Sequence, residues 1–393
     1  MIGDAQVNTM AKPLVVLAAG GTGGHVFPAE ALAAELGTRG YRLALITDRR
    51  GGNLSGRLAE LETHRVRAGG IVGKGFFARI FSAFEILIGT FQAWFLLRRM
   101  KPAVVVGFGG YASVPTMLAA AYSGTKAAIH EQNAVLGRAN RLLASRVEKI
   151  ATSFEKVSSI PEPALSNVIV TGMPVRPAVA TVRDREYPNL SDDGTINLAV
   201  FGGSQGAHIF SEVVPAAMKR LSDKTRARIK ITQQSRPEDI DQARSAYQAL
   251  GIDAAISNFF DDVPEHIADA HLVICRSGAS TIAELTTIGR PAIMVPYRHA
   301  VDDHQSKNAH AVDEVGGGWL IPEDAFSEDV LADRIESLFA MPRMLENAAS
   351  AAKSAGKPDA AARLADMVMD LISDNGNGNG NRNSSADDQR EAA

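Results

Sequence analysis

Three glycine-rich clusters stand where phosphate or sugar groups could be bound. Each follows a short apolar run, and they read AGGTGGH (Ala19–His25), GFGGY (Gly107–Tyr111) and FGGSQGA (Phe201–Ala207). Glycine permits positive φ and close backbone approach, and a helix that begins after such a turn offers free N–H groups to an anion. Any single cluster could be a tight turn without a ligand, but three at predicted strand ends favour binding. None matches G-x-G-x-x-G or G-x-x-x-x-G-K-[ST], which argues against a dinucleotide dehydrogenase or a P-loop NTPase.

A second group of polar residues follows apolar runs later in the chain. The segment CRSGASTIAEL (Cys275–Leu285) opens a helix with small residues, and Glu284 lies about one turn into it. A carboxylate there could accept hydrogen bonds from two ribose hydroxyls, or it could only be a favourable charge near a helix N-terminus. The polar stretch Asp302–Gln305 could be a solvated loop, or its amide could bond sugar hydroxyls. Together the two segments predict a sugar-nucleotide pocket at the carboxyl ends of parallel strands.

These residues need a framework of parallel strands whose ends meet at one edge. Short runs rich in Val, Ile and Leu alternate with helix-length amphipathic segments, which is typical of parallel α/β layers. The predicted strands are Leu14–Ala19, Arg42–Thr47, Val104–Gly107, Lys126–His130, Lys149–Thr152, Ile196–Phe201, Arg228–Thr232, Ala255–Asn258, Leu272–Cys275 and Ala292–Val295. The later series repeats the layout of the first, so we expect two doubly wound halves joined near Thr171–Pro177.

The C-terminal part of the chain has a helical pattern followed by a polar segment. The segment Ser327–Ser373 has a helical pattern, and its last helix could pack back on the first half. From Asp374 onward the sequence NGNGNGNRNSSADDQREAA holds too little apolar surface to fold, so we expect a disordered tail.

Composition narrows the class of protein. The 393 residues are enough for two ordinary domains, and a net charge of −3 gives no basic excess of the kind that nucleic-acid binding requires. One cysteine, Cys275, excludes an internal disulfide, and no signal-peptide pattern opens the chain. We therefore expect a cytoplasmic protein that does not bind nucleic acid.

Six motifs occur in the order that a known family has them. They are GGTGGHVFPA, HEQN (His130–Asn133), TGMPVR (Thr171–Arg176), GGSQGA, CRSGA with the later Glu284, and DDHQ. From about Pro13 to the closing helix, the chain resembles the MurG family of peptidoglycan N-acetylglucosaminyltransferases. The resemblance implies the GT-B fold, an α/β architecture of two Rossmann-like doubly wound domains facing a cleft. It also implies an acceptor- and membrane-associated domain at 12–176, joined by a closing helix at about 346–372, and a UDP-sugar-binding domain at 177–345. The segment 374–393, the disordered tail expected from composition, has no counterpart in the family.

A reaction is implied by the same resemblance. It is inverting transfer of N-acetylglucosamine from UDP-N-acetylglucosamine to the 4-hydroxyl of undecaprenyl-diphosphate-linked N-acetylmuramyl-pentapeptide, with no cofactor. The family motifs would put Glu284 on the ribose hydroxyls and the backbone of Phe260 beside uracil. All the donor contacts carried over by motif are Thr22, Gly23, Gly24, Asn133, Arg176, Ser204, Phe260, Ala279, Ser280, Thr281, Ile282, Ala283, Glu284 and Gln305. Ala29 and Ala134 stand where many relatives have Gly, a small departure.

An inverting transfer needs a base for the acceptor hydroxyl and a partner for the departing diphosphate. His25 is one candidate base, because a helix N-terminus disfavours imidazolium; it could instead only cap the turn. Glu131 is the competing base, with a structural role equally open. Backbone N–H groups, the hydroxyls of Ser204 and the Ser277–Ser280 turn, and Arg176 would meet the charge of UDP, which makes a metal unnecessary. The D-x-D sequence Asp239–Asp241 reads as a solvated helix face, and no Cys/His spacing resembles a zinc site.

An apolar stretch between Ile71 and Leu97 has helical spacing and basic flanks. Arg79, Glu85 and Gln92 within it argue against a spanning helix. For the half from Leu87 to Leu97 we expect a core helix. For the half with Phe76, Phe77, Ile80, Phe81 and Phe84 we expect a patch that rests in the lipid interface, because the implied acceptor is lipid-anchored.

Other functions remain open. The chain could be a GT-B relative with another lipid acceptor, a UDP-N-acetylglucosamine epimerase, or a non-catalytic sugar-nucleotide-binding partner. An epimerase would need acid–base groups around the sugar ring and no acceptor channel. On the favoured interpretation, the partners are UDP-N-acetylglucosamine, the lipid-linked muramyl-pentapeptide, the membrane surface and possible cell-wall synthesis proteins. The expected location is then the cytoplasmic face of the bacterial inner membrane.

Overall fold

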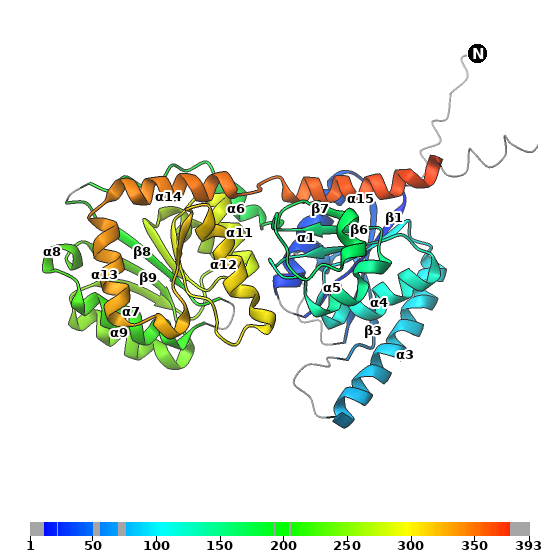
Figure 1. Ribbon diagram of the computed structural model, residues 1–393, viewed down its shortest axis with the longest axis horizontal. Coiled ribbons are helices and arrows are strands. Elements are labelled where there is room, and N and C mark those ends of the chain that lie inside the picture. The colour runs from blue at the N-terminus through cyan, green and yellow to red at the C-terminus, as the bar shows by residue number, and fades with distance from the viewer. Residues whose placement is uncertain are drawn as a thin grey trace, which may run out of the picture.

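Two parallel β-sheets, each wrapped by helices, form two lobes that lie side by side (Figure 1). The computed structural model describes residues 12–21, 23–49, 56–69, 76–191, 193–203 and 206–377. We call the half built on the seven-stranded sheet the first lobe and the half built on the six-stranded sheet the second lobe. This confirms the GT-B architecture of two doubly wound halves.

The first lobe has every strand pair parallel. Its sheet has the order β3-β2-β1-β4-β5-β6-β7. The strands are β1 (Leu14–Ala18), β2 (Arg42–Asp48), β3 (Glu62–Val66), β4 (Val104–Gly107), β5 (Ala127–Glu131), β6 (Lys149–Thr152) and β7 (Val168–Val170). The helices of this half are α1 (Gly23–Thr38), α2 (Gly56–Ala59), α3 (Phe76–Met100), α4 (Gly110–Ser123) and α5 (Arg138–Leu143), with short 3-10 turns at Ala144–Arg146 and Glu162–Asn167. One core lies under α1 and the other under α3 and α4, so both sheet faces are covered.

The second lobe repeats this plan with the strand order β10-β9-β8-β11-β12-β13. The strands are β8 (Ile196–Phe201), β9 (Ile229–Gln234), β10 (Asp253–Ser257), β11 (Leu272–Cys275), β12 (Ala292–Met294) and β13 (Gly318–Leu320). The helices are α6 (Pro177–Val182), α7 (His208–Arg220), α8 (Asp223–Arg226), α9 (Ile240–Ala249), α10 (Val263–Asp269), α11 (Ala279–Ile288), α12 (His304–Glu314) and α13 (Glu328–Phe339), with 3-10 turns at Pro237–Asp239, Val301–Asp303 and Glu323–Ala325. The cores on the two faces are again separate.

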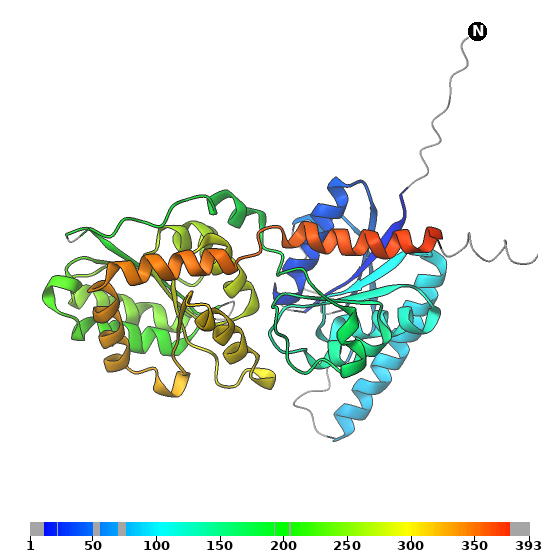
Figure 2. The ribbon, with the colours of Figure 1, turned by 45° about the horizontal axis from the view of Figure 1, so that its top comes forward.

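Two helices replace the single closing helix that the sequence predicts. They are α14 (Pro342–Ala355) and α15 (Ala360–Asn377). Helix α14 packs on α11 and α13 of the second lobe, whereas α15 packs on α1 of the first lobe. Both views show them end to end across the two lobes (Figures 1 and 2). The break falls at Gly356, where a Cβ would come within 2.5 Å of the Thr286 carbonyl oxygen, and Pro358 follows.

The expected start of the disordered tail is also too early. Helix α15 continues to Asn377, so the first residues after Asp374 are helical. The rest of the predicted tail, 378–393, lies outside the described residues.

Helix α3 departs from the sequence interpretation in its second half. Gly89 lets the helix approach the first lobe, since a Cβ there would meet the carbonyl oxygen of Arg67. Ala93 and Leu97 are buried as expected, but Phe91 is 62% exposed and Phe95 is 59% exposed. The interpretation of the Leu87–Leu97 half as a core helix is therefore wrong for its outer side, because only one face of the helix meets the lobe.

Candidate active site

The first lobe presents His25 on a fixed hydrogen-bond chain. His25 lies near the N-terminus of α1, and its Nδ1 is 3.2 Å from Gln132 Oε1. The Gln132 amide nitrogen lies 2.9 Å from the Phe108 carbonyl and 3.1 Å from the His130 carbonyl, so it must donate, and its oxygen accepts from His25. Nδ1 of His25 is therefore the donor, and in the neutral tautomer with this bond the lone pair is on Nε2.

The buried His130 anchors this chain from below. Its Nε2 lies 3.1 Å from the carbonyl of Gly172 and its Nδ1 lies 3.1 Å from the Gln132 amide nitrogen. Burial lowers the pKa of His130 to about 4, and the nearby His25 adds to the effect. A neutral ring with Nε2 as donor and Nδ1 as acceptor satisfies both bonds.

Glycines make room for the His25 ring. A Cβ on Gly110 would lie 3.1 Å from Cδ2 and 3.3 Å from Nε2 of His25, and Gly109 and Gly110 both have positive φ. The cluster GFGGY thus places the start of α4 against the imidazole rather than only closing a turn. His25, Gly109, Gly110 and Tyr111 line a hollow of about 220 Å³ that Asp302 and His304 complete from the second lobe.

Glu131, the competing base, has four hydrogen-bond donors. Oε1 accepts from the backbone N–H of Asn133 at 3.0 Å and from its side-chain amide at 3.3 Å. Oε2 accepts from the Gly137 N–H and from the Asn140 amide, each at 2.8 Å. The carboxylate is buried and holds the loop after β5 in shape.

On the second lobe, Glu284 is paired with Arg176. The Arg176 Nε donates to Glu284 Oε1 at 2.9 Å, and the guanidinium also lies 5.6 Å from the centre of the Phe27 ring in α1. Burial raises the pKa of Glu284, and Arg176 opposes that shift. Arg176 therefore connects the predicted ribose-binding acid to the helix that carries His25.

The turn before α11 leaves its helix N-terminus open. Gly278 is the N-cap and makes no side-chain capping bond, and residues 279–284 form the first turns of α11. The Ser277 hydroxyl donates to the Gln305 carbonyl at 2.8 Å and so binds α12. The predicted helix start is therefore present, and its N-cap residue supplies no side-chain acceptor to the first N–H groups.

Gln305 lies on helix α12 rather than in a polar loop. Its side-chain oxygen accepts from the Tyr297 N–H at 2.9 Å, which fixes the preceding loop. Arg276 supports that loop from below by donating to the carbonyls of Val295 and Pro296 and to Glu323. The expected polar loop at Asp302–Gln305 is therefore a 3-10 turn that leads into a helix.

An ion pair crosses between the lobes at the rim of the hollow. Arg138 of α5 donates to both carboxylate oxygens of Asp302, with Nη2 to Oδ1 at 2.7 Å, and this pairing lowers the pKa of Asp302. Asp302 has φ 54°, an uncommon conformation for a residue with a side chain. This contact could not be predicted from the sequence, because residues 164 positions apart give no local signal.

The remaining predicted residues lie in several places. Phe260 packs inward, with its ring 6.4 Å from that of Phe201. Thr22 and Ser204 lie outside the described residues, and Gly23 and Gly24 are the first residues of α1.

The D-x-D sequence differs from the expected solvated helix face at its first residue. Asp239 is only 4% exposed, and its carboxylate lies 2.8 Å from Nδ1 of His208. Asp241 lies on the surface as expected. Within the described ranges, no group of three or more His, Cys, Asp or Glu side chains could hold a metal ion.

Comparison with known proteins gives one consistent result. The family model for the glycosyltransferase family 28 N-terminal domain matches residues 15–152, and that for the C-terminal domain of the same family matches residues 197–364. The chain is 59% identical over 362 residues to the UDP-N-acetylglucosamine--N-acetylmuramyl-(pentapeptide) pyrophosphoryl-undecaprenol N-acetylglucosamine transferase of Paramagnetospirillum magneticum, covering 92% of this chain and 97% of that one.

Solved structures agree on the fold. The crystal structure of Acinetobacter baumannii MurG superimposes with a TM-score of 0.74 at 28% identity, covering 91% of this chain and 99% of that one. A UDP-GlcNAc 2-epimerase from Neisseria meningitidis, solved with UDP-GlcNAc bound, superimposes with a TM-score of 0.63 at 13% identity, covering 91% of this chain and all of that one. The second likeness shows a shared fold alone.

Proposed function

The chain belongs to glycosyltransferase family 28 and to its MurG branch, and from this premise we propose how its two lobes perform the transfer. The enzyme moves N-acetylglucosamine from UDP-N-acetylglucosamine to the lipid-linked N-acetylmuramyl-pentapeptide, the step from lipid I to lipid II. The observation that carries the mechanism is that Arg176 pairs with Glu284 of the second lobe and also packs on Phe27 of α1, the first-lobe helix that carries His25.

Donor binding is assigned to the second lobe. Glu284 accepts hydrogen bonds from the ribose hydroxyls and the open N-terminus of α11 binds the diphosphate, because free N–H groups and the helix dipole favour an anion. Arg176 pairs with the buried carboxylate in the absence of nucleotide and is assigned as a cation for the diphosphate. The other assigned donor contacts are Gly23, Gly24, Asn133, Phe260, residues 279–283 and Gln305, with Thr22 and Ser204 from outside the described residues.

Base catalysis is assigned to Nε2 of His25. Gln132 holds the proton on Nδ1, so Nε2 can take the proton of the acceptor 4-hydroxyl as its oxygen bonds to C1 of the sugar. The bond from C1 to the UDP oxygen breaks, and UDP leaves with the electron pair. Attack from the face opposite UDP inverts the configuration at C1. Glu131 is assigned a positioning role, since both of its oxygens already accept hydrogen bonds.

No step in this scheme passes through a metal ion. The developing charge on UDP is met by backbone N–H groups at α11 and by Arg176, which are preorganised donors in a partly buried site. Transfer is therefore expected to continue in EDTA.

Helix α3 is assigned to the membrane surface. Ile80, Phe81 and Phe84 are each more than half exposed, and Leu87, Phe91 and Phe95 continue the apolar side. The side chains of Phe76 and Phe77 lie outside the described residues. By length and composition Ile80–Met100 could cross a membrane, but Arg67 ties Glu85 and Gln92 of this helix to the first lobe. An interfacial position fits these contacts better.

The proposed location and domain limits follow from this assignment. The protein lies on the cytoplasmic face of the inner membrane, where the lipid-linked acceptor is reached, and cell-wall synthesis proteins are its candidate partners. Its acceptor domain spans 12–176 and takes α15 as its last helix. The donor domain spans 177–345 and extends through α14, because α14 packs on the second lobe.

A UDP-release assay tests the function. The protein is incubated in EDTA with UDP-N-acetylglucosamine and a short-chain lipid-linked muramyl-pentapeptide. UDP release that depends on the acceptor is the expected result. Formation of UDP-N-acetylmannosamine without acceptor would instead identify an epimerase, and a strict Mg²⁺ requirement would contradict the metal-free scheme.

A further inference from the structure

Asn308 is a buried polar residue at the contact between the lobes. It lies on α12 and is fully buried, at 0% exposure. Its side-chain oxygen accepts from the Ala134 N–H of the first lobe at 2.8 Å. Its side-chain nitrogen donates to the Asn133 side-chain oxygen at 3.1 Å and to the Ser277 carbonyl at 3.0 Å. We propose that Asn308 is a positioning residue that sets how the two lobes meet across the cleft, an inference that rests on the proposed transferase function.

The three partners of Asn308 belong to the two segments that carry the site. Asn133 and Ala134 lie in the loop that Glu131 anchors after β5. Ser277 lies in the turn that opens α11, and its hydroxyl bonds Gln305 one turn before Asn308 in the same helix. A single side chain thus joins the first-lobe loop to the donor turn.

The chemistry of an amide is required at this position. The Asn308 side-chain oxygen accepts one hydrogen bond, and its side-chain nitrogen donates two. An aspartate has the same size, but its second oxygen would face two acceptor oxygens. An alanine would leave the Ala134 N–H and the Ser277 carbonyl buried without these partners.

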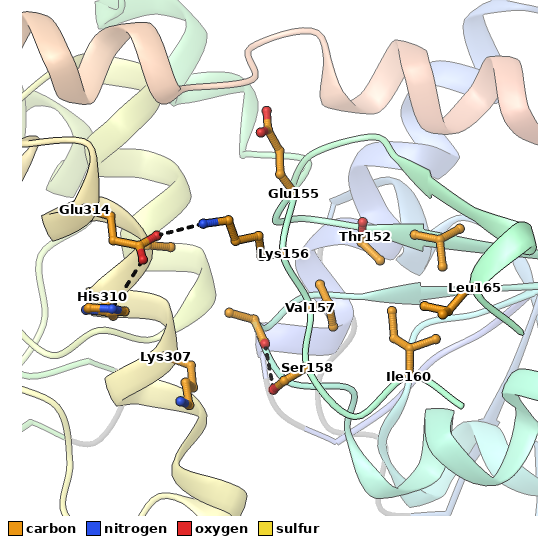
Figure 3. A pocket seen from close by; sticks show the side chains of 13 residues that line it. Thr152, Glu155, Lys156, Val157, Ser158, Ile160, Leu165, Lys307, His310 and Glu314 are labelled. Atoms are coloured by element: carbon orange, nitrogen blue, oxygen red, sulfur yellow. Dashed lines mark hydrogen bonds and ion pairs between the residues drawn. The ribbon is translucent and has the colours of Figure 1, made fainter. Parts of the chain in front are cut away.

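Other contacts between the lobes are more exposed. Lys156 of the first lobe pairs with Glu314 of α12 at 3.5 Å, with 88% and 45% of the two side chains exposed, and Arg138 in its pair with Asp302 is half-exposed. Exposed pairs of this kind contribute little to holding two surfaces in register. Figure 3 shows Lys307, His310 and Glu314 of α12 facing the Lys156–Ser158 segment across a second interlobe hollow of about 500 Å³.

Two partners of Asn308 line different hollows. Ala134 lines the 500 Å³ hollow and Asn133 lines the hollow that contains His25. Loss of this bridge would remove both bonds to the first-lobe loop and one bond to the Ser277 carbonyl, whereas the Arg176–Glu284 pair does not involve Asn308. Loss of Asn308 should therefore impair transfer, which needs both lobes, more than binding of UDP, whose assigned contacts lie mainly on the second lobe.

The test compares Asn308→Ala and Asn308→Asp with a matched control, Asn197→Ala. Asn197 lies near the start of β8, away from the cleft, and its amide bonds the Asp269 carbonyl. For both Asn308 variants we expect kcat to fall at least tenfold while the Kd for UDP changes less than threefold. The control should keep wild-type kcat. A wild-type kcat in Asn308→Ala, or a parallel loss of kcat and UDP affinity, would overturn the proposal.

Hydrogen exchange supplies a readout that does not need activity. The Ala134 amide should exchange faster in Asn308→Ala than in the wild type or in Asn197→Ala, because its acceptor is gone. If the Ala134 amide exchanged equally slowly in Asn308→Ala and in the wild type, the positioning role of Asn308 would be wrong. If the wild type releases no UDP in the presence of acceptor, the proposed function fails, and the exchange result alone decides whether Asn308 joins the lobes.

Discussion

At the scale of single residues, the site depends on buried groups whose protonation is fixed by their neighbours. His130, Gln132 and His25 form a chain in which each hydrogen-bond direction determines the next, and the chain ends with a lone pair on His25 Nε2. The motif HEQN identifies this region in the sequence. It does not reveal that Gln132 orients His25, because the two residues are 107 positions apart.

The buried His130 predicts a pH dependence of stability. Its pKa is about 4 in the folded protein and near 6.5 when exposed, so the unfolded chain binds one more proton between these values. The stability that the neutral ring contributes is present above pH 6.5 and is lost as the pH falls to 4, by about 3 kcal/mol. Urea unfolding of the wild type and of His130→Gln from pH 7 to 4 measures this, and the wild-type free energy of unfolding should fall more steeply. Parallel curves would show that His130 does not titrate in this way.

At the scale of elements, the strands with long apolar runs could be predicted from the sequence, but the short or polar strands at the edges of the sheets could not. All ten strands expected from apolar runs are present, within a few residues. The three that were missed are edge or short strands: β3 reads ETHRV with three charged or titratable side chains, while β7 and β13 have three residues each. Their pairing comes from a neighbouring strand rather than from their own sequence. The bridge from α12 to the first lobe was equally invisible, since it joins side chains more than 170 positions apart.

Helix α3 carries the prediction at this scale. Replacing Phe84 and Phe91 together by Asp should weaken binding to anionic phospholipid vesicles by at least roughly tenfold, because two apolar side chains leave the lipid and two negative charges enter. A vesicle sedimentation assay measures the bound fraction. The control is Val330→Asp, an exposed apolar position on α13 of the second lobe. Equal binding of the double variant and the control would remove α3 from the membrane contact.

At the scale of the whole molecule, we propose that the two lobes divide one reaction between them. In the proposed scheme, the second lobe binds the nucleotide through Glu284 and the start of α11, and the first lobe supplies His25 as base and contacts the membrane through α3. Arg176 and Asn308 connect the halves. Binding and chemistry should therefore be separable by substitutions on opposite sides of the cleft.

The most direct test of this division is calorimetric titration of UDP in EDTA, paired with kcat for transfer, using His25→Ala and Glu284→Ala. The account predicts that His25→Ala binds UDP like the wild type and loses most of its turnover. Glu284→Ala should lose about tenfold or more in UDP affinity, since a charged hydrogen-bond acceptor is removed from the ribose. Wild-type turnover in His25→Ala, or wild-type UDP affinity in Glu284→Ala, would contradict the assignment of base and donor site to these two lobes.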